Sequence, residues 1–128
     1  MKNDSDLRDP LTLARSCAAF LDEKKISDVS IFDVEESLSI TSYFVIGTGL
    51  NQRHLQSVVD LLERHLKERG VVRRGLEGYR EGKWILFDLG DVIVHLFQGE
   101  SRKYYDLELL WGDHSFVQEA TGAAGGPR

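Results

Sequence analysis

The chain has 128 residues, of which 41% are apolar and 29% charged, and its formal net charge is −5. This length suits one domain with a hydrophobic core, and the balance of apolar and charged residues is typical of globular proteins. No apolar run in the sequence approaches the roughly 20 residues that a membrane-spanning helix requires. The negative charge disfavours a broad phosphate-neutralising surface, so we expect no direct DNA binding, whereas a basic protein partner is compatible.

The two ends of the chain differ in composition from its middle. The first nine residues are polar and resemble neither a secretory leader nor an organelle-targeting leader, so we expect a flexible N-terminus, 1–9, on a cytoplasmic protein. The C-terminal residues, 115–128, end in "TGAAGGPR", which has no periodicity and little to bury, and this predicts a disordered tail. One domain, 10–114, remains between them. Its single cysteine, Cys17, lies among small and apolar residues and is expected to be buried.

Capping residues and apolar spacing predict two helices in the first half of the chain. Asp9 followed by Pro10 is typical of a helix start, so the first helix should run from Pro10 to Lys24. Asn51 can cap a second helix over Gln52 to Arg69, which carries one apolar stripe and ends at a glycine.

Short β-branched and aromatic runs predict strands. "VSIFDV" (29–34) and "SYFVIG" (42–47) should form an antiparallel pair, the second being broken by the Gly47-Thr48-Gly49 run. "VVRRGLEG" (71–78) predicts a short edge strand, and "KWILFDLGDVIVHLF" (83–97) predicts a hairpin that turns at Leu89-Gly90.

Ser101 can cap a last helix over Arg102 to Trp111. The order of elements is helix, two strands, helix, three strands, helix. It predicts a single α/β (α+β) domain with a mixed five-stranded sheet packed against helices.

Pairing the hairpin residues assigns its two faces. If Asp88 flanks Asp91 across the turn, Trp84 lies opposite His95, and residues that lie opposite each other share a face. The apolar face is core and carries Ile85, Phe87, Val92, Val94 and Leu96. The other face is mixed and carries Trp84, Leu86, Asp88, Asp91, Ile93, His95 and Phe97. This mixed face either packs under the last helix or binds a partner, because Trp, Tyr and Arg are common both in cores and at interface hot spots.

The same pairing separates a possible acid–base pair. It puts His95 four residues along the strand from Asp88, or about 13 Å at ~3.3 Å per residue. A hydrogen-bonded Asp–His pair needs about 3 Å, so the pairing favours a structural or interface role for His95.

Two interpretations of Asp88 and Asp91 stand. Two carboxylates at a turn can hold Mg²⁺, as in a metal-dependent nucleotidyl or phosphoryl transferase. Aspartates beside a tight turn that contains glycine also commonly bond to their own backbone.

Other patterns with possible chemistry are weaker. Gly47-Thr48-Gly49 lies between a strand and a helix, but the chain lacks both established phosphate-binding glycine motifs. Asp33 and Glu35 have the spacing of transferase carboxylates, yet they precede the Gly-Thr-Gly turn, the reverse of the usual order. The histidines His54, His65 and His114 are given no metal role, and no cofactor, metal or catalytic residue is expected.

Three segments together resemble a known family. "TSYFVIGTGLNQRHLQSVVDLLERHLKERG", "WILFDLGDVIVHLF" and "ESRKYYDLELLWGD" are similar, in order and spacing, to the ribosomal silencing factor (RsfS, or Iojap) family over about Leu13 to Asp113. The resemblance implies a fold related to nucleotidyl transferases that lacks their catalytic set, and a protein that is not an enzyme.

The resemblance also implies a partner and a binding surface. Family members bind the large ribosomal subunit through its basic fourteenth protein, block joining of the small subunit, and repress translation when nutrients are short. Carried onto this chain, the partner-binding residues are Trp84, Asp91, His95, Arg102 and Tyr105. Glu77 and Gly78 match a family Glu-Gly pair that precedes the tryptophan, and the family further suggests a homodimer of the free protein.

Overall fold

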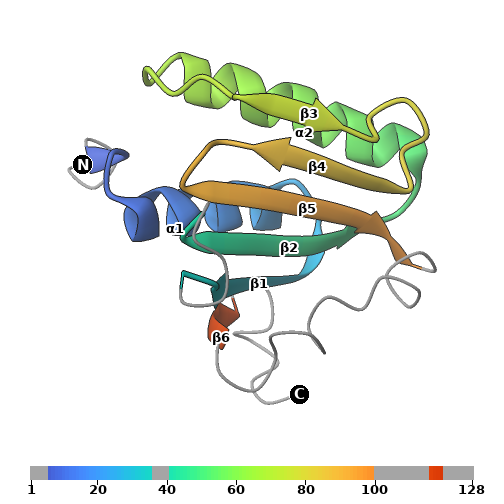
Figure 1. Ribbon diagram of the computed structural model, residues 1–128. Coiled ribbons are helices and arrows are strands. Elements are labelled where there is room, and N and C mark those ends of the chain that lie inside the picture. The colour runs from blue at the N-terminus through green and yellow to red at the C-terminus, as the bar shows by residue number, and fades with distance from the viewer. Residues whose placement is uncertain (1–5, 36–40, 100–115, 120–128) are drawn as a thin grey trace.

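In a computed structural model, described for residues 6–35, 41–99 and 116–119, one mixed sheet is covered on one face by two helices (Figure 1). The sheet has six strands in the order β3-β4-β5-β2-β1-β6. The pairing of β2 with β5 is parallel, and the other four pairings are antiparallel. The predicted α/β (α+β) class and mixed sheet are confirmed, with one strand more than expected. No helix in the described ranges is long and apolar enough to cross a membrane.

Helix α1 (Pro10–Glu23) begins where the sequence predicts. The Asp9 carboxylate accepts hydrogen bonds from the Thr12 backbone N–H (3.0 Å) and the Thr12 hydroxyl (2.8 Å), which satisfies one of the unpaired donors of the first turn. Its inner face packs on β1, β2 and β5. Cys17 lies on that face and is fully buried, and burial raises the pKa of its thiol to about 12.

Strands β1 (Ser27–Asp33) and β2 (Tyr43–Gly49) pair antiparallel, as predicted. A bulge between Ser27 and Ser30 disturbs the register, and Asp28 takes a positive φ of 51° within it. The prediction that the Gly-Thr-Gly run breaks the second strand is wrong, because β2 continues through Gly49. A Cβ at Gly47 would lie 2.5 Å from Ile26, and one at Gly49 would lie 2.4 Å from Leu55. Gly47 therefore lets the connection from α1 to β1 approach the sheet closely, and Gly49 does the same for α2.

Helix α2 (Gln52–Lys67) also begins at its predicted cap, where the Asn51 side chain accepts a hydrogen bond from the His54 backbone N–H (2.8 Å). It ends two residues earlier than expected. One stripe of buried side chains faces the sheet: Leu55, Val58, Val59, Leu62 and Leu66. The opposite side of the helix is mainly polar and exposed, with Leu61 half-buried on it.

Strands β3 (Gly75–Glu77), β4 (Trp84–Asp88) and β5 (Val92–Gln98) complete the predicted five. The predicted faces of the β4–β5 hairpin are confirmed, but its register is wrong by two residues, since Trp84 pairs with Phe97 and Leu86 pairs with His95. The turn consists of Gly90 and Asp91, closed by the Leu89 N–H bonded to the Val92 carbonyl. Gly90 has a φ of 94°, and a two-residue hairpin favours glycine at this first central position.

The sixth strand, β6 (Phe116–Glu119), corrects the expectation for the C-terminus. These four residues lie in the segment predicted as a disordered tail, but they pair antiparallel with β1 at the edge of the sheet. The glycines and alanines that follow dominated the prediction, whereas Phe116 and Val117 suit a strand. At the other end, Leu7 is only 7% exposed and belongs to the main core, so the described part of 1–9 is packed rather than free. The predicted helix Arg102 to Trp111 lies outside the described residues.

Candidate functional site

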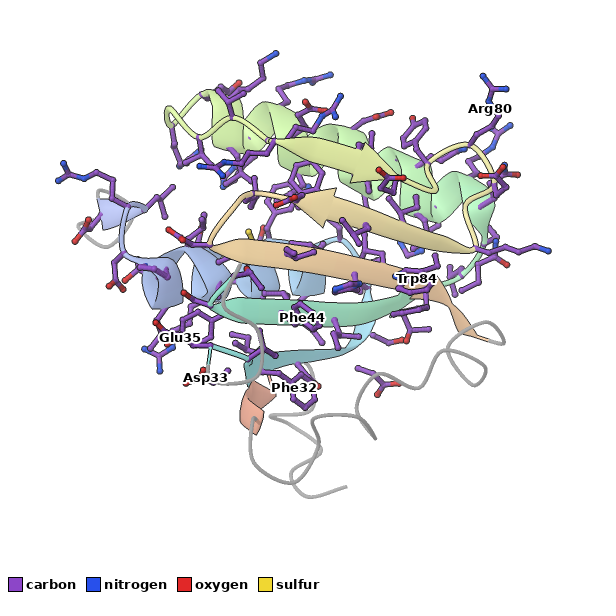
Figure 2. The ribbon with its side chains drawn as sticks, viewed as in Figure 1. Phe32, Asp33, Glu35, Phe44, Arg80 and Trp84 are labelled. Carbon is purple, nitrogen blue, oxygen red and sulfur yellow. The ribbon has the colours of Figure 1, made fainter. Side chains whose placement is uncertain are left out.

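The sheet face opposite the two helices carries a second, mainly aromatic cluster, which we call the aromatic face. It consists of Phe32, Val34, Phe44, Ile46 and Phe97, with Trp84 and Ile93 packed against them and His95 in ring contact. Figure 2 shows Phe44 and Trp84 on the side of the sheet turned away from the helices. Four strands, β1, β2, β4 and β5, contribute to this cluster, so the sheet itself fixes the positions of the side chains. Phe32, Phe44 and Phe97 are buried, whereas Trp84 and Ile93 are half-buried.

Trp84 is held in place by two neighbours on β5. Its indole stacks on Phe97, with ring centroids 5.2 Å apart and planes 23° from parallel. Its Nε1–H donates a hydrogen bond of 3.1 Å to Nδ1 of His95, which lies diagonally across the hairpin. Because one partner packs on the ring and the other fixes its polar edge, the indole has a defined orientation.

His95 is nearly enclosed, with 3% of its surface exposed. Phe44 meets its ring edge-on at a centroid distance of 4.4 Å. Burial lowers the pKa of His95 to about 4, so the imidazole is neutral at pH 7. Since Nδ1 accepts the hydrogen bond from Trp84, the proton resides on Nε2, which is buried and has no hydrogen-bond partner among the described residues. His95 therefore supports Trp84 and presents almost no surface of its own.

The loop that precedes Trp84 is held by hydrogen bonds to β5 and by close backbone packing at Gly78. From β5, the Gln98 side chain donates to the Gly82 carbonyl (2.8 Å) and the Gln98 N–H donates to the Lys83 carbonyl (3.1 Å). Gly78 has a φ of 76°, and a Cβ there would lie 2.1 Å from the Trp84 carbonyl oxygen. Any larger residue would clash with the Trp84 backbone, which explains the glycine of the Glu-Gly pair. The tryptophan thus begins its strand on a rigid support.

The structure does not bring Asp91 near Trp84. Asp91 is exposed in the hairpin turn beyond the far end of β4, level with Gly90 and therefore roughly 20 Å from Trp84 at ~3.3 Å per residue. Its carbonyl accepts the N–H groups of Ser42 and Tyr43, which ties the turn to β2. Trp84 and Asp91 therefore mark opposite ends of the hairpin.

Asp88 bonds to the backbone of its own turn, which was one of the two interpretations left open by the sequence. Its Oδ1 accepts a hydrogen bond from the Gly90 N–H (2.8 Å), so the carboxylate closes its own turn. Asp88 lies opposite Ile93 rather than Asp91, which corrects the predicted pairing. The corrected register also places His95 two residues, not four, from Asp88, but the hydrogen-bond partner of His95 is Trp84.

The remaining candidate carboxylates have local partners. Asp33 Oδ1 accepts a hydrogen bond from the Glu35 N–H (3.1 Å), and Figure 2 shows both residues at the end of β1 away from Trp84. His54 joins two backbones: Nδ1 accepts from the Leu50 N–H (3.0 Å), and Nε2 lies 2.9 Å from the Lys24 carbonyl oxygen. Within the described ranges, no group of three or more His, Cys, Asp and Glu side chains is arranged to hold a metal ion.

The sequence patterns did not identify two members of the aromatic face, Phe32 and Phe44. Phe32 and Phe44 complete the cluster, but their face could not be assigned until the pairing of β1, β2 and β5 was known. Alternation along 29–34 and 42–47 was the available signal. Arg102 and Tyr105, the other two predicted partner-binding residues, lie outside the described residues.

Comparison with known proteins extends the sequence resemblance. Residues 7–125 match the family model described as "Ribosomal silencing factor during starvation". A ribosomal silencing factor of Bacillus subtilis is 35% identical over 102 residues, covering 80% of this chain and 86% of that protein. The corresponding protein of Haemophilus influenzae is 40% identical over 91 residues, covering 71% of this chain and 89% of that one.

Solved structures agree with these sequence matches. A crystal structure of a Chromobacterium violaceum protein superposes with a TM-score of 0.74 at 33% identity, covering 93% of this chain and 96% of that chain. A Bacillus halodurans structure gives a TM-score of 0.73 at 31% identity, covering 84% of this chain and 98% of that one. On the evidence of the family model, the curated relatives and the shared fold, the chain belongs to the ribosomal silencing factor (RsfS) family.

Proposed function

We propose that this protein binds the large ribosomal subunit through that subunit's basic fourteenth protein and sterically prevents the small subunit from joining. The result is repression of translation, above all when nutrients are limiting, in the cytoplasm. The protein acts by occupying a surface, and it makes and breaks no covalent bond. One observation carries the proposal: this chain holds the half-buried indole of Trp84 rigidly on the sheet face opposite α1 and α2, against the buried Phe97 and His95.

Two kinds of evidence support the large subunit as the partner. The bacterial relatives are named ribosomal silencing factors. A mouse relative, 35% identical over 101 residues, is named for assembly of the mitochondrial ribosomal large subunit, and this chain covers 44% of its length. The net charge of −5 is complementary to a basic ribosomal protein.

Trp84 is the proposed anchor of the docking surface. Large, rigid aromatic side chains with a polar edge contribute most at interface hot spots, because little conformational entropy is lost when they bind. His95 acts through Trp84 by accepting its indole N–H. Asp91, Arg102 and Tyr105 are the further partner-binding candidates, with Asp91 at the opposite end of the hairpin.

Sedimentation of purified ribosomal subunits tests the proposal. Small and large subunits are mixed at a magnesium concentration that favours joining, with and without saturating protein, and separated on a sucrose gradient. We expect fewer joined ribosomes and co-sedimentation of the protein with the large subunit. Unchanged joining at saturating protein would contradict the proposed function.

A further inference from the structure

An open groove lies on the opposite side of α2 from its buried stripe. It is a hollow of about 460 Å³ between α2 and the β3–β4 loop, residues 78–83, and Leu61 and Tyr79 supply apolar surface to its lining. Its remaining lining residues are polar or charged: Arg53, Gln56, Ser57, Asp60 and Arg64. The groove shares no residue with the aromatic face.

Two exposed arginines, Arg53 and Arg64, line this groove, and a third, Arg80, lies on the adjacent loop. Arg53 and Arg64 are eleven residues apart on α2, which places them within about 20° around the helix axis and roughly 16 Å apart along it. Arg80 extends into solvent from the β3–β4 loop (Figure 2). Within the described ranges, none of the three guanidinium groups forms an ion pair, whereas nearby Arg73 is bound to Glu63 at 2.7 Å. These three cations are therefore available to an external anion.

The local charge is opposite to that of the whole chain. From Gln52 to Lys83 there are eight lysines and arginines against five aspartates and glutamates, although the full chain has a net charge of −5. The positive excess is spread over α2, β3 and the segments that follow each of them, and the negative excess lies elsewhere in the chain. A local cluster of positive charge makes the electrostatic potential around it positive even when the net charge of the protein is negative.

The walls of the groove are fixed before any ligand binds. The Gln52 side chain donates to the Arg80 carbonyl (2.6 Å), and the Gln56 side chain donates to the Tyr79 carbonyl (2.8 Å), so α2 holds the loop directly. Asp60, the one acid among the described lining residues, accepts a hydrogen bond from the Tyr79 hydroxyl on both carboxylate oxygens (2.9 and 3.1 Å). The Asp60 carboxylate is therefore paired with a neutral hydroxyl group inside the groove.

We propose that this groove binds the phosphate backbone of RNA. Arginine forms two parallel hydrogen bonds to phosphate, and the separation of Arg53 from Arg64 is too large for one phosphate to contact both. An extended chain of phosphates satisfies this spacing, whereas a single small anion does not. The inference rests on the proposed function, because a ribosomal surface presents RNA beside protein.

The position of the groove fits simultaneous docking. Arg80 is four residues from Trp84, and the rigid loop between them joins the groove to the start of the aromatic face. Trp84 can therefore contact ribosomal protein while the arginines contact neighbouring RNA. Phosphate contacts of this kind fix orientation and carry no sequence preference.

Binding of a fluorescein-labelled 12-nucleotide RNA to the full chain, followed by anisotropy from 20 to 200 mM salt, tests the groove directly. The Arg53→Gln/Arg64→Gln double variant should bind at least tenfold more weakly, and its slope of log affinity against log salt should fall by about 1.4 to 1.8. The matched control is Arg8→Gln/Arg15→Gln, which removes the same charge from exposed arginines outside the groove. Undetectable binding by the wild type at 20 mM salt, or equal loss in both double variants, would overturn the inference.

Asp60→Asn supplies a test in the opposite direction. Among the described lining residues it removes the only acid while keeping an acceptor for Tyr79, so RNA binding should become several-fold tighter. A mononucleotide competitor, added at constant ionic strength, distinguishes a small-molecule pocket. Displacement of the RNA by mononucleotide at equal phosphate concentration would also overturn the proposal of an extended backbone site.

Large-subunit binding separates this inference from the proposed function. If both hold, Arg53→Gln/Arg64→Gln weakens co-sedimentation with large subunits and lowers its salt dependence, while Arg8→Gln/Arg15→Gln does not. If the function holds and the groove inference fails, both variants co-sediment like the wild type and bind RNA like it. If the function alone fails, labelled RNA still binds through the arginines while joining of subunits is unaffected.

Discussion

At the scale of single residues, Trp84 should dominate docking. Trp84→Ala removes the indole from Phe97 and His95, and we expect binding to the large subunit to weaken by about 2 kcal/mol or more, roughly 30-fold in Kd. Quantitative co-sedimentation measures the change. Val72→Ala, which trims a side chain that is 66% exposed just before β3, serves as the control and should bind normally. A Trp84→Ala protein that is folded and binds like the wild type would rule out the anchor role.

Because His95 is neutral and buried, it makes stability depend on pH. Its pKa is about 4 in the folded protein and near 6.5 when unfolded, so only the unfolded chain takes up the proton between these values. The folded state should therefore lose up to roughly 3 kcal/mol of stability as pH falls from 6.5 to 4. Urea unfolding across this range gives the slope. In His95→Gln the slope should become shallower, and an unchanged slope would assign the pH dependence to other groups.

At the scale of elements, β6 protects the edge of the sheet. It pairs with Ser30, Ile31 and Phe32 of β1, so deleting residues 116–128 should leave that edge unpaired. We expect the free energy of unfolding to fall by about 2 kcal/mol, as several backbone hydrogen bonds are lost. Deletion of 120–128 alone, which keeps β6, is the control and should unfold at the wild-type denaturant concentration. Equal stability of the two truncated proteins would mean that β6 contributes nothing.

Local signals in the sequence predicted the elements well where they were strong. Asp9 and Asn51 gave both helix starts because a capping side chain acts on donors only three residues away. The faces of the hairpin also followed from alternation alone. Its register did not, since moving the turn by one residue shifts the pairing by two and leaves each side chain on the same face. Turn chemistry at Gly90 decided the register.

Non-local features were beyond the sequence patterns. The hydrogen bond from Trp84 to His95 depends on the two-residue shift in register, and the contribution of Phe44 depends on the parallel pairing of β2 with β5. The α2 groove was missed for a similar reason. Arg53 and Arg64 look like an ordinary solvated helix face until Gln52 and Gln56 are seen to hold the β3–β4 loop beside them.

At the scale of the whole molecule, the centre of the sheet is built from distant parts of the chain. Strands β2 and β5 are adjacent and parallel, yet Tyr43 pairs with Val92, 49 residues later. A fragment of residues 1–90 contains both helices and four strands but lacks the central strand β5. We expect this fragment to lack a cooperative unfolding transition in urea, measured by circular dichroism, whereas the full chain has one. Cooperative unfolding of the fragment would show that the helices and β1–β2 form a core of their own.

The same parallel pairing has a consequence for synthesis and folding rate. Joining β2 to β5 closes a loop that contains α2, β3 and β4, and the entropy of that closure must be lost before the central hydrogen bonds form. A nascent chain cannot complete its core until β5 has left the exit tunnel of the ribosome that makes it. Each new molecule therefore completes the centre of its sheet only after Val92–Gln98 has emerged, although α1, β1 and β2 emerge earlier.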